Sequence, residues 1–136
     1  MKYYADKKFP LKFPPEQYYV DQIKRISKLF DDVPLFVYIF TDDSSPLGLV
    51  EKIKKAVNKN NITFACRNRG NVHYAHVVED FYNMSRFDCL IRSGSHFAIA
   101  AQLLGSHKII IYPKHWQWVG KKLVIDEVFI VDHRVS

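Results

Sequence analysis

The feature that most constrains the fold is an unbroken run of apolar and aromatic residues at positions 35–40. A strand with one solvated face alternates apolar and polar residues, whereas a strand buried on both faces, as in a parallel sheet, is apolar throughout. Shorter, mainly apolar runs follow at residues 62–66, 89–91 and 108–112. Between these runs the apolar residues recur every three or four positions, which predicts helices.

Regular alternation of helix and strand predicts an α/β fold with right-handed crossover connections. We expect a Rossmann-like open parallel sheet with helices on both faces, in a three-layer α/β/α arrangement. The 136 residues, 48% of them hydrophobic, suffice for one core. We therefore predict an extended arm over residues 1–15 and a single domain over residues 16–136, closed by a short strand or segment at residues 123–131.

Four helices are predicted, and Pro14 and Pro15 suit the first turn of the first one, where a missing N–H group costs nothing. The fourth spans residues 97–104 and ends at Gly105, a residue typical of a helix C-terminus. The predicted buried faces of the other three are Tyr19, Ile23, Ile26 and Phe30; Leu47, Val50, Ile53 and Val57; and Val77, Phe81 and Met84.

A short turn, Ser93-Gly94-Ser95, joins the strand at residues 89–91 to the helix that follows. Such a turn leaves backbone N–H groups unpaired at the positive end of the helix dipole, which attracts anions. In α/β folds the phosphate of a nucleotide binds beyond the carboxyl ends of the strands. The two serines are equally suited to cap the helix, and the sequence leaves both roles open.

Polar side chains follow each predicted strand, and in one parallel sheet they would gather at the same edge. The four sets are Thr41, Asp42 and Asp43; Arg67 and Asn68; Arg92, Ser93, Gly94 and Ser95; and Lys114, His115 and Trp116. Since they combine cations, carboxylates and hydroxyl groups, we predict a ligand site at this edge.

Four aromatic residues are candidates for a platform on which a sugar or a base stacks: Tyr18, Tyr19, Trp116 and Trp118. Tyr19 also lies on the predicted buried face of the first helix, where core packing is the simpler role. The sequence leaves the role of the other three open.

The net charge of +6 suggests an anionic ligand or partner, but the lysines and arginines are scattered, so no nucleic-acid partner is predicted. Cys66 and Cys89 lie in apolar segments, as reduced thiols of cytoplasmic proteins do. No apolar run is long enough to span a membrane, and no membrane partner is expected. The six histidines lack the spacing of a metal site, so we predict neither a metal nor a cofactor.

Several short patterns between residues 35 and about 118 resemble motifs of one known family. They are the Thr41-Asp42-Asp43 that closes an aromatic strand (S/T-D-D), the Asp80 and Met84 of a helix (D-x-x-x-M), the Ser95-His96-Phe97-Ala98 turn (S-x-F-S), and Pro113 with Trp116 (P-x-x-W). This family is the fucosyltransferases that use GDP-fucose, the α-1,2 type and their bacterial relatives. The chain departs from it at Ala98, where the family has a second serine, and at Ile99-Ala100, where a tryptophan pair often stands.

The resemblance implies the C-terminal, nucleotide-sugar-binding half of a GT-B glycosyltransferase, with GDP-fucose as donor substrate and a glycan as acceptor. It implies that Ser95 lies near the donor phosphate and Asp80 near the base or ribose. The remaining residues of the implied nucleotide site are Arg92, Ser93, Gly94 and His96, and those of its rim are Thr41, Asp42, Asp43, Arg67, Lys114 and Trp116.

One motif of that family, H-x-R-x-G, lies upstream on the other half and supplies an arginine to the pyrophosphate; it is not found in this sequence. We therefore expect a fragment that binds a donor and does not transfer its sugar. The alternative is a non-catalytic α/β module that binds an anion or a protein partner. Such a module would self-associate as a homodimer through the surface that the missing half leaves open.

Overall fold

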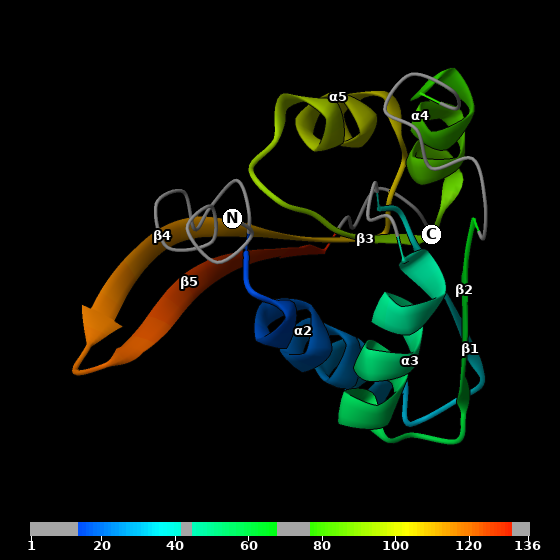
Figure 1. The fold of residues 1–136 in the computed structure, drawn as a ribbon. Helices are drawn as coiled ribbons and strands as arrows, with labels where there is room; N and C mark the ends of the chain where they lie inside the picture. Colours follow the sequence, from blue (N-terminus) through cyan, green and yellow to red (C-terminus); the bar gives the residue numbers. More distant parts are fainter. Residues whose placement is uncertain (1–13, 42–44, 68–76, 132–136) are drawn as a thin grey trace. The chain divides into compact units, whose positions relative to one another are not determined.

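The computed structural model describes residues 14–41, 45–67 and 77–131 (Figure 1). These residues form a mixed α/β structure, as predicted. The helices are α2 (Glu16–Leu29), α3 (Pro46–Val57), α4 (Val77–Arg86) and α5 (His96–Leu104). The strands are β1 (Leu35–Ile39), β2 (Ile62–Cys66), β3 (Cys89–Ile91), β4 (Ile109–Val119) and β5 (Lys122–Val131).

The described strands form two separate sheets, so this part of the chain does not show the predicted single open parallel sheet in a three-layer arrangement. One sheet pairs β1 with β2, and the other has the order β3-β4-β5. The chain is likewise divided into two compact units, each of which contains one of the sheets. We name Val20–Asp80 the central unit, and the described residues before Val20 and after Asp80 the hairpin unit. Of the predicted arm, only Pro14 and Pro15 lie within the described residues, directly before α2.

In the central unit β1 and β2 run parallel, with Leu35 opposite Ile62 and Ile39 opposite Cys66. The helix that connects them, α3, buries Pro46, Val50, Ile53 and Val57. Pro46 takes the first buried position in place of the predicted Leu47, which is exposed. The helix ends at Asn58, whose φ of 51° is left-handed and whose N–H donates to the carbonyl oxygen of Lys54.

A polar cluster fixes the end of α2 in the central unit. The buried Ser27 hydroxyl donates to Asp32 Oδ1 at 2.9 Å, and Lys59 Nζ donates to the same oxygen at 2.8 Å. Asn61 Nδ2 donates to Ser27 Oγ and to the carbonyl oxygen of Val33, both at 3.0 Å. The hydrogen bond from Lys59, and after it the one from Ser27, holds the pKa of the Asp32 carboxyl below its ordinary value. Together with the two hydrogen bonds from Asn61, they tie the loop that follows α2 to the residue before β2.

The buried face of α2 differs from the predicted one. Ile23 and Ile26 are buried as expected, but Tyr19 is only half-buried and Phe30 is exposed. Two polar residues, Gln22 and Ser27, are buried in addition.

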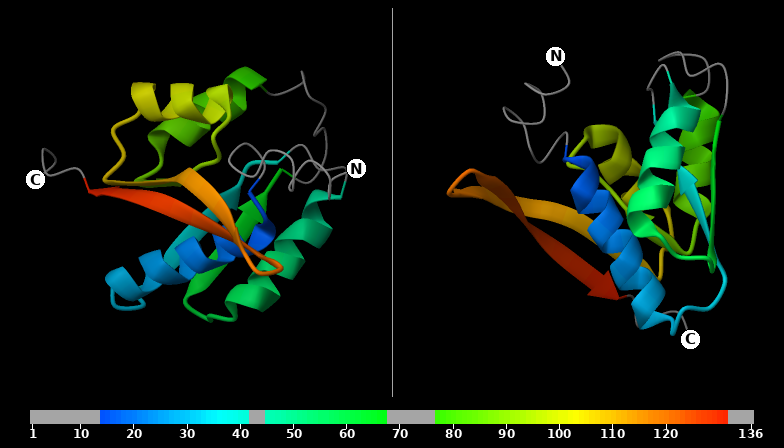
Figure 2. Two further views of the ribbon diagram at one scale, coloured as in Figure 1. Left: turned by 90° about the vertical axis from the view of Figure 1, so that its left-hand side faces the viewer. Right: turned by 60° about the horizontal axis from the view of Figure 1, so that its bottom comes forward.

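In the hairpin unit β3 pairs with β4 in parallel, and β4 pairs with β5 antiparallel. Gly120, at a left-handed φ of 64°, and Lys121 form the turn of the β4–β5 hairpin. The two strands form a long twisted ribbon, and α5 lies over the end of β4 that is paired with β3 (Figures 1 and 2). The buried apolar residues of this unit include Leu90, Ala98, Ala101, Ile109 and Ile111.

The prediction that the fourth strand stops at Pro113 is wrong. β4 continues through Pro113 to Val119, and the register skips one residue between Pro113 and His115. A bulge at this place accommodates a proline, since the ladder is already interrupted there. Lys114, His115 and Trp116 therefore lie within a strand and not in a loop beyond it. The predicted closing segment at residues 123–131 is the strand β5.

Candidate functional site

The Ser-Gly-Ser turn forms the N-terminal cap of α5. Ser95 has extended backbone angles (φ −71°, ψ 149°), and its Oγ accepts a hydrogen bond from the N–H of Ala98 at 3.3 Å. Ser93 Oγ accepts from the N–H of Ser95 at 3.3 Å and donates to Ser95 Oγ at 3.1 Å. The capping role, one of the two that the sequence left open, is thus present in the structure.

The cap leaves part of the first helical turn unpaired. A capping side chain satisfies one of the N–H groups that a helix N-terminus exposes, while the others need partners from elsewhere. Within the described part of the chain, the N–H groups of His96 and Phe97 have no hydrogen-bond partner. Both residues are exposed. Two donors at the positive end of the α5 dipole are therefore accessible to an anion.

Arg92, directly before this turn, is a buried cation with only 9% of its surface exposed. Its Nε donates to Gln102 Oε1 of α5, and its Nη1 donates to the carbonyl oxygen of Ser93 at 2.9 Å. The guanidinium carbon lies 4.3 Å from the centre of the Tyr112 ring, a cation–π contact. Burial lowers the pKa of Arg92 from its ordinary value, but the group stays charged at neutral pH.

No carboxylate among the described residues forms an ion pair with Arg92. Its Nη2 makes no hydrogen bond to any of them either. Buried charges in proteins are ordinarily paired, because an unpaired one forfeits its solvation without compensation. The amide oxygen of Gln102, one carbonyl oxygen and an aromatic face supply only partial negative charge. An anionic ligand would supply the full negative charge that these partners of the Arg92 guanidinium lack.

Tyr18 holds the backbone of this site in place. It is buried, and its Oη donates to the carbonyl oxygen of Arg92 at 3.3 Å. Burial raises the pKa of its phenol far above the ordinary value, so the hydroxyl remains a donor. The buried position excludes Tyr18 from the predicted aromatic platform.

Two further predicted residues meet in the central unit. Arg67 Nη2 lies 2.8 Å from Asp80 Oδ1 and 3.3 Å from Glu79 Oε1. The hydrogen bond with Asp80 raises the pKa of Arg67. This ion pair links the residue after β2 to the first turn of α4. Asp80, which the resemblance places near a base or ribose, is thus engaged by an arginine of its own chain.

The other predicted rim residues lie as follows. Thr41 comes shortly after β1 and is half-buried, whereas Asp42, Asp43 and Asn68 lie outside the described residues. Lys114 is exposed in the bulge of β4, and Trp116 is half-buried on the same strand. The structure thus brings together Arg92 to His96 in the hairpin unit, and Arg67 with Asp80 in the central unit.

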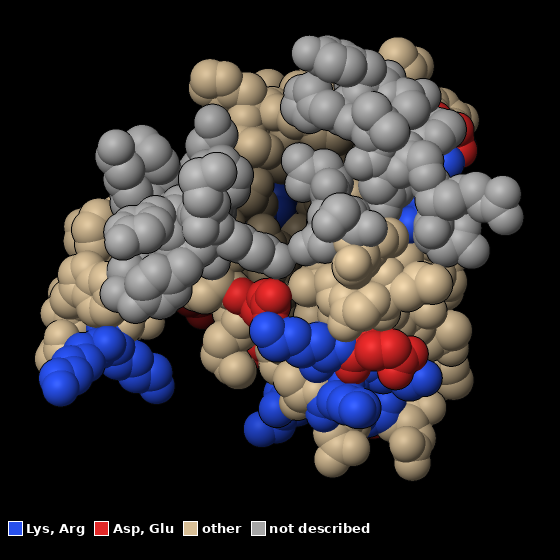
Figure 3. Space-filling view, in the orientation of Figure 1, with Lys and Arg blue, Asp and Glu red and all other residues tan. Residues whose placement is uncertain are grey.

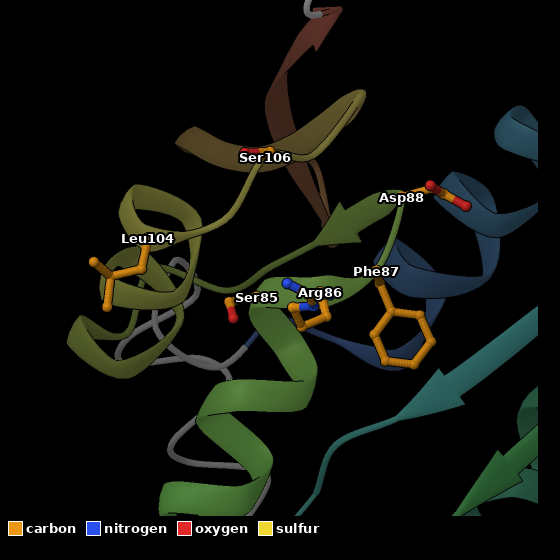
Figure 4. Close-up of a pocket in the computed structure, with 6 residues that line it drawn as sticks. All are labelled: Ser85, Arg86, Phe87, Asp88, Leu104 and Ser106. Carbon is orange, nitrogen blue, oxygen red and sulfur yellow. The ribbon is translucent and has the colours of Figure 1, made fainter. Parts of the chain in front are cut away.

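A hollow of about 220 Å³ lies at the opposite end of α5 from the cap (Figure 4). It is lined by Ser85, Arg86, Phe87, Asp88, Leu104 and Ser106. In Figure 4 the Phe87 ring points away from Ser85 and Leu104. None of the predicted site residues lines this hollow, which occurs at the amino end of β3.

Sequence reasoning missed His107, which is buried at 2% exposure close to this end of α5. Its Nε2 donates to the carbonyl oxygen of Met84 at 2.9 Å. Nδ1 has no hydrogen-bond partner within the described residues. A single histidine after a helix-ending glycine carries no signal from which this burial could be predicted.

Neither thiol is activated by a lowered pKa. Burial raises the pKa of Cys66, and burial together with the nearby Asp88 raises the pKa of Cys89 to about 11. A thiol with a raised pKa is protonated at neutral pH and unreactive. In the described ranges, no group of three or more His, Cys, Asp or Glu side chains could hold a metal ion.

No protein-family model, no curated protein and no solved structure matches this chain. Among the helices that the structure describes, none combines the length and the apolar character needed to cross a membrane.

Proposed function

We propose that this chain binds a phosphorylated ligand, the diphosphate of a nucleotide sugar, at Arg92 and the first turn of α5. The observation that carries the proposal is the buried guanidinium of Arg92, for which no described residue provides a counter-charge. In the chain, Arg92 comes directly before the Ser93-Gly94-Ser95 cap of α5, and within the described residues two N–H groups of the first turn of that helix are unpaired. Phosphate oxygens would accept from these N–H groups, and Nη2 of Arg92 would donate to the same anion.

The identity of the ligand is a further part of the proposal. The Asp80 and Ser95 patterns resemble those of the GDP-fucose-dependent transferases, which favours GDP over other nucleotides. In that setting the chain would be the Rossmann-like C-terminal half of a GT-B enzyme. The diphosphate would occupy the α5 turn, and a donor would bind without being turned over.

Calorimetric titration with GDP, UDP, ADP and inorganic pyrophosphate tests this proposal. We expect GDP to bind most tightly. Equal affinity for GDP and pyrophosphate would favour the alternative function, an anion-binding module that does not recognise the nucleotide base. An absence of heat with all four compounds up to millimolar concentration would reject the site.

A substitution in the first turn isolates the backbone contribution. Proline is favourable at the first helical position, and the extended Ser95 before it is compatible with a following proline. His96→Pro therefore removes one N–H donor and leaves the helix intact, whereas the matched control His96→Ala keeps that donor. We expect His96→Pro to weaken binding about tenfold relative to His96→Ala, the effect of one hydrogen bond to a charged group.

A further inference from the structure

In the part of the chain that the structure describes, β5 is an edge strand. β5 is the last strand of the β3-β4-β5 sheet, and no described strand pairs with its other side. Edges of this kind are templates for pairing with another chain unless charges or bulges prevent it. Only a partner with a complementary pattern of side chains can use such an edge.

The first half of β5 carries a pattern that complements itself. Residues 122–126 read Lys-Leu-Val-Ile-Asp, that is, one cation, three apolar residues and one carboxylate. If a second copy runs antiparallel with Val124 opposite Val124, then Lys122 of each chain faces Asp126 of the other. Leu123 of each chain then faces Ile125 of the other, which gives two apolar pairs. Residues directly opposite each other in an antiparallel pair share a face, so both ion pairs and all apolar pairs are in contact.

The charges favour this register over its neighbours. A register centred on Asp126 or on Glu127 places identical carboxylates opposite each other, which is destabilising. A register centred on Ile125 places Val124 opposite Asp126. In the register centred on Val124, both members of the Lys122–Asp126 ion pair are accessible to a second copy, because both side chains are exposed. Among the described residues, the ion-pair contact of Asp126 is a long one with His115, 3.7 Å from Nδ1 to Oδ2.

The hairpin also presents an apolar face beside this edge. Trp118 is paired with Leu123, and Trp116 with Ile125, so these four side chains share one face of the ribbon. Trp118 is 45% exposed, and the other three are half-buried. An isolated two-stranded ribbon is only marginally stable in water. Pairing through β5 would join two such faces into one apolar surface and add strands to the ribbon.

We propose that two copies of this chain associate through residues 122–126 of β5. The strands pair antiparallel about Val124 and make one continuous sheet, in the order β3-β4-β5 followed by β5-β4-β3 of the second copy. Lysine side chains lie at the turn end of the hairpin (Figure 3), where Lys121 of the turn directly precedes the paired segment and would lie opposite Glu127 of the second copy.

Charge reversal tests this pairing by sedimentation velocity over a range of protein concentrations. Lys122→Glu and Asp126→Lys each turn two opposite-charge pairs into like-charge pairs, and each should weaken the dimer roughly tenfold. The double variant Lys122→Glu/Asp126→Lys restores both pairs and should restore the dimer. Lys55→Glu on α3 makes the same change of net charge as Lys122→Glu away from β5, and His115→Ala removes the contact of Asp126 within its own chain. Neither control should change the dimer.

Cross-linking locates the interface independently. In a variant with Cys66→Ser and Cys89→Ser, the substitution Val124→Cys should give covalent dimers with a short bis-maleimide. Gln117→Cys, directly opposite Val124 on β4 of the same hairpin, is the matched control and should not. A monomer at all concentrations, a double charge variant as weak as the singles, or stronger cross-linking at position 117 would each overturn the proposal.

Discussion

At Gly105, which ends α5, φ is −90° and ψ is 170°, values that any residue adopts. The sequence predicts a glycine C-cap, whose usual reason is a left-handed backbone. Here the reason is space. A Cβ atom at this position would lie 2.6 Å from the carbonyl oxygen of Ser85 and against the ring of His107. The end of α5 approaches the end of α4 closely because no side chain intervenes.

Gly105→Ala should therefore lower the free energy of unfolding by about 1–3 kcal/mol, as overpacking does. Gly48→Ala is the matched control. Gly48 lies within α3, and a Cβ there meets no atom within 4 Å. That substitution should be neutral, or stabilising by up to about 1 kcal/mol through helix propensity. Urea denaturation of both variants measures the difference, and equal stability of the two would contradict the role assigned to Gly105.

Cys89 should react slowly with iodoacetamide at neutral pH, and its rate should rise until the pH approaches about 11, the pKa that burial imposes. The ordinary value is 9.0, so the unfolded chain ionises first as the pH rises. The contribution of Cys89 to stability is therefore complete below pH 9 and lost between about pH 9 and 11. Alkylation followed by peptide mass spectrometry measures the rate. A fast reaction at pH 7 would show that the thiol is not buried as described.

Among the elements, α5 illustrates how a cap and an anion site can share one turn. Ser95 satisfies one N–H with its hydroxyl, and two others stay unpaired. The sequence could not choose between the two roles, since both follow from the same residues. The structure shows that the cap does not exhaust the donors.

Ser95→Asp should separate these two roles. Aspartate caps as well as serine, so helix stability should hold, whereas Ser95→Ala should lose about 1 kcal/mol. The added carboxylate repels a bound phosphate, so Ser95→Asp should bind pyrophosphate and GDP more weakly than the parent protein. Thermal denaturation and calorimetry report the two effects. If Ser95→Asp bound both ligands as tightly as the parent protein, the anion would not be bound at this turn.

Two elements differ from their predictions for reasons that lie in the tertiary structure. Gln22 and Ser27 are buried on α2, where a reading by apolar periodicity assigns only Tyr19, Ile23, Ile26 and Phe30. Ser27 tolerates burial because Asp32 and Asn61 hydrogen-bond to it. β4 passes Pro113 because a bulge removes the cost of the missing N–H. Neither partner nor bulge is visible in the local pattern.

At the scale of the whole molecule, the predicted ligand edge depended on a single sheet. The described strands form two sheets, and the predicted residues are divided between two units. Arg92 to His96 belong to one unit, and Arg67 and Asp80 to the other. The proposed function therefore depends on the Arg92 turn alone, with Asp80 as a further element of the proposal.

The purified chain should transfer no fucose from GDP-fucose to simple galactosides. Transfer requires a positioned base and compensation for the charge of the leaving diphosphate, and the H-x-R-x-G motif that serves the resembled family is not found in this sequence. Donor hydrolysis should stay at the background rate. Chromatography of labelled product measures both reactions. Product that depends on donor and protein would contradict this expectation, and Arg92→Ala would then identify the contribution of the guanidinium.

The sequence by itself determined most of the local structure. Apolar runs placed β2 at residues 62–66 and β3 at residues 89–91, and the periodicity of Val50, Ile53 and Val57 placed α3. The Ser-Gly-Ser turn placed the start of α5 within one residue. These features depend on propensities and spacing over a few residues, which the sequence contains directly.

Only the tertiary structure decided which strands pair and which polar groups are satisfied. The antiparallel β4–β5 hairpin, the division into two sheets and the burial of Arg92 without a carboxylate all arise between residues far apart in the chain. Tyr18, for example, donates to the carbonyl oxygen of Arg92 across 74 positions. Such contacts depend on where the whole chain places its groups, and no local pattern encodes them.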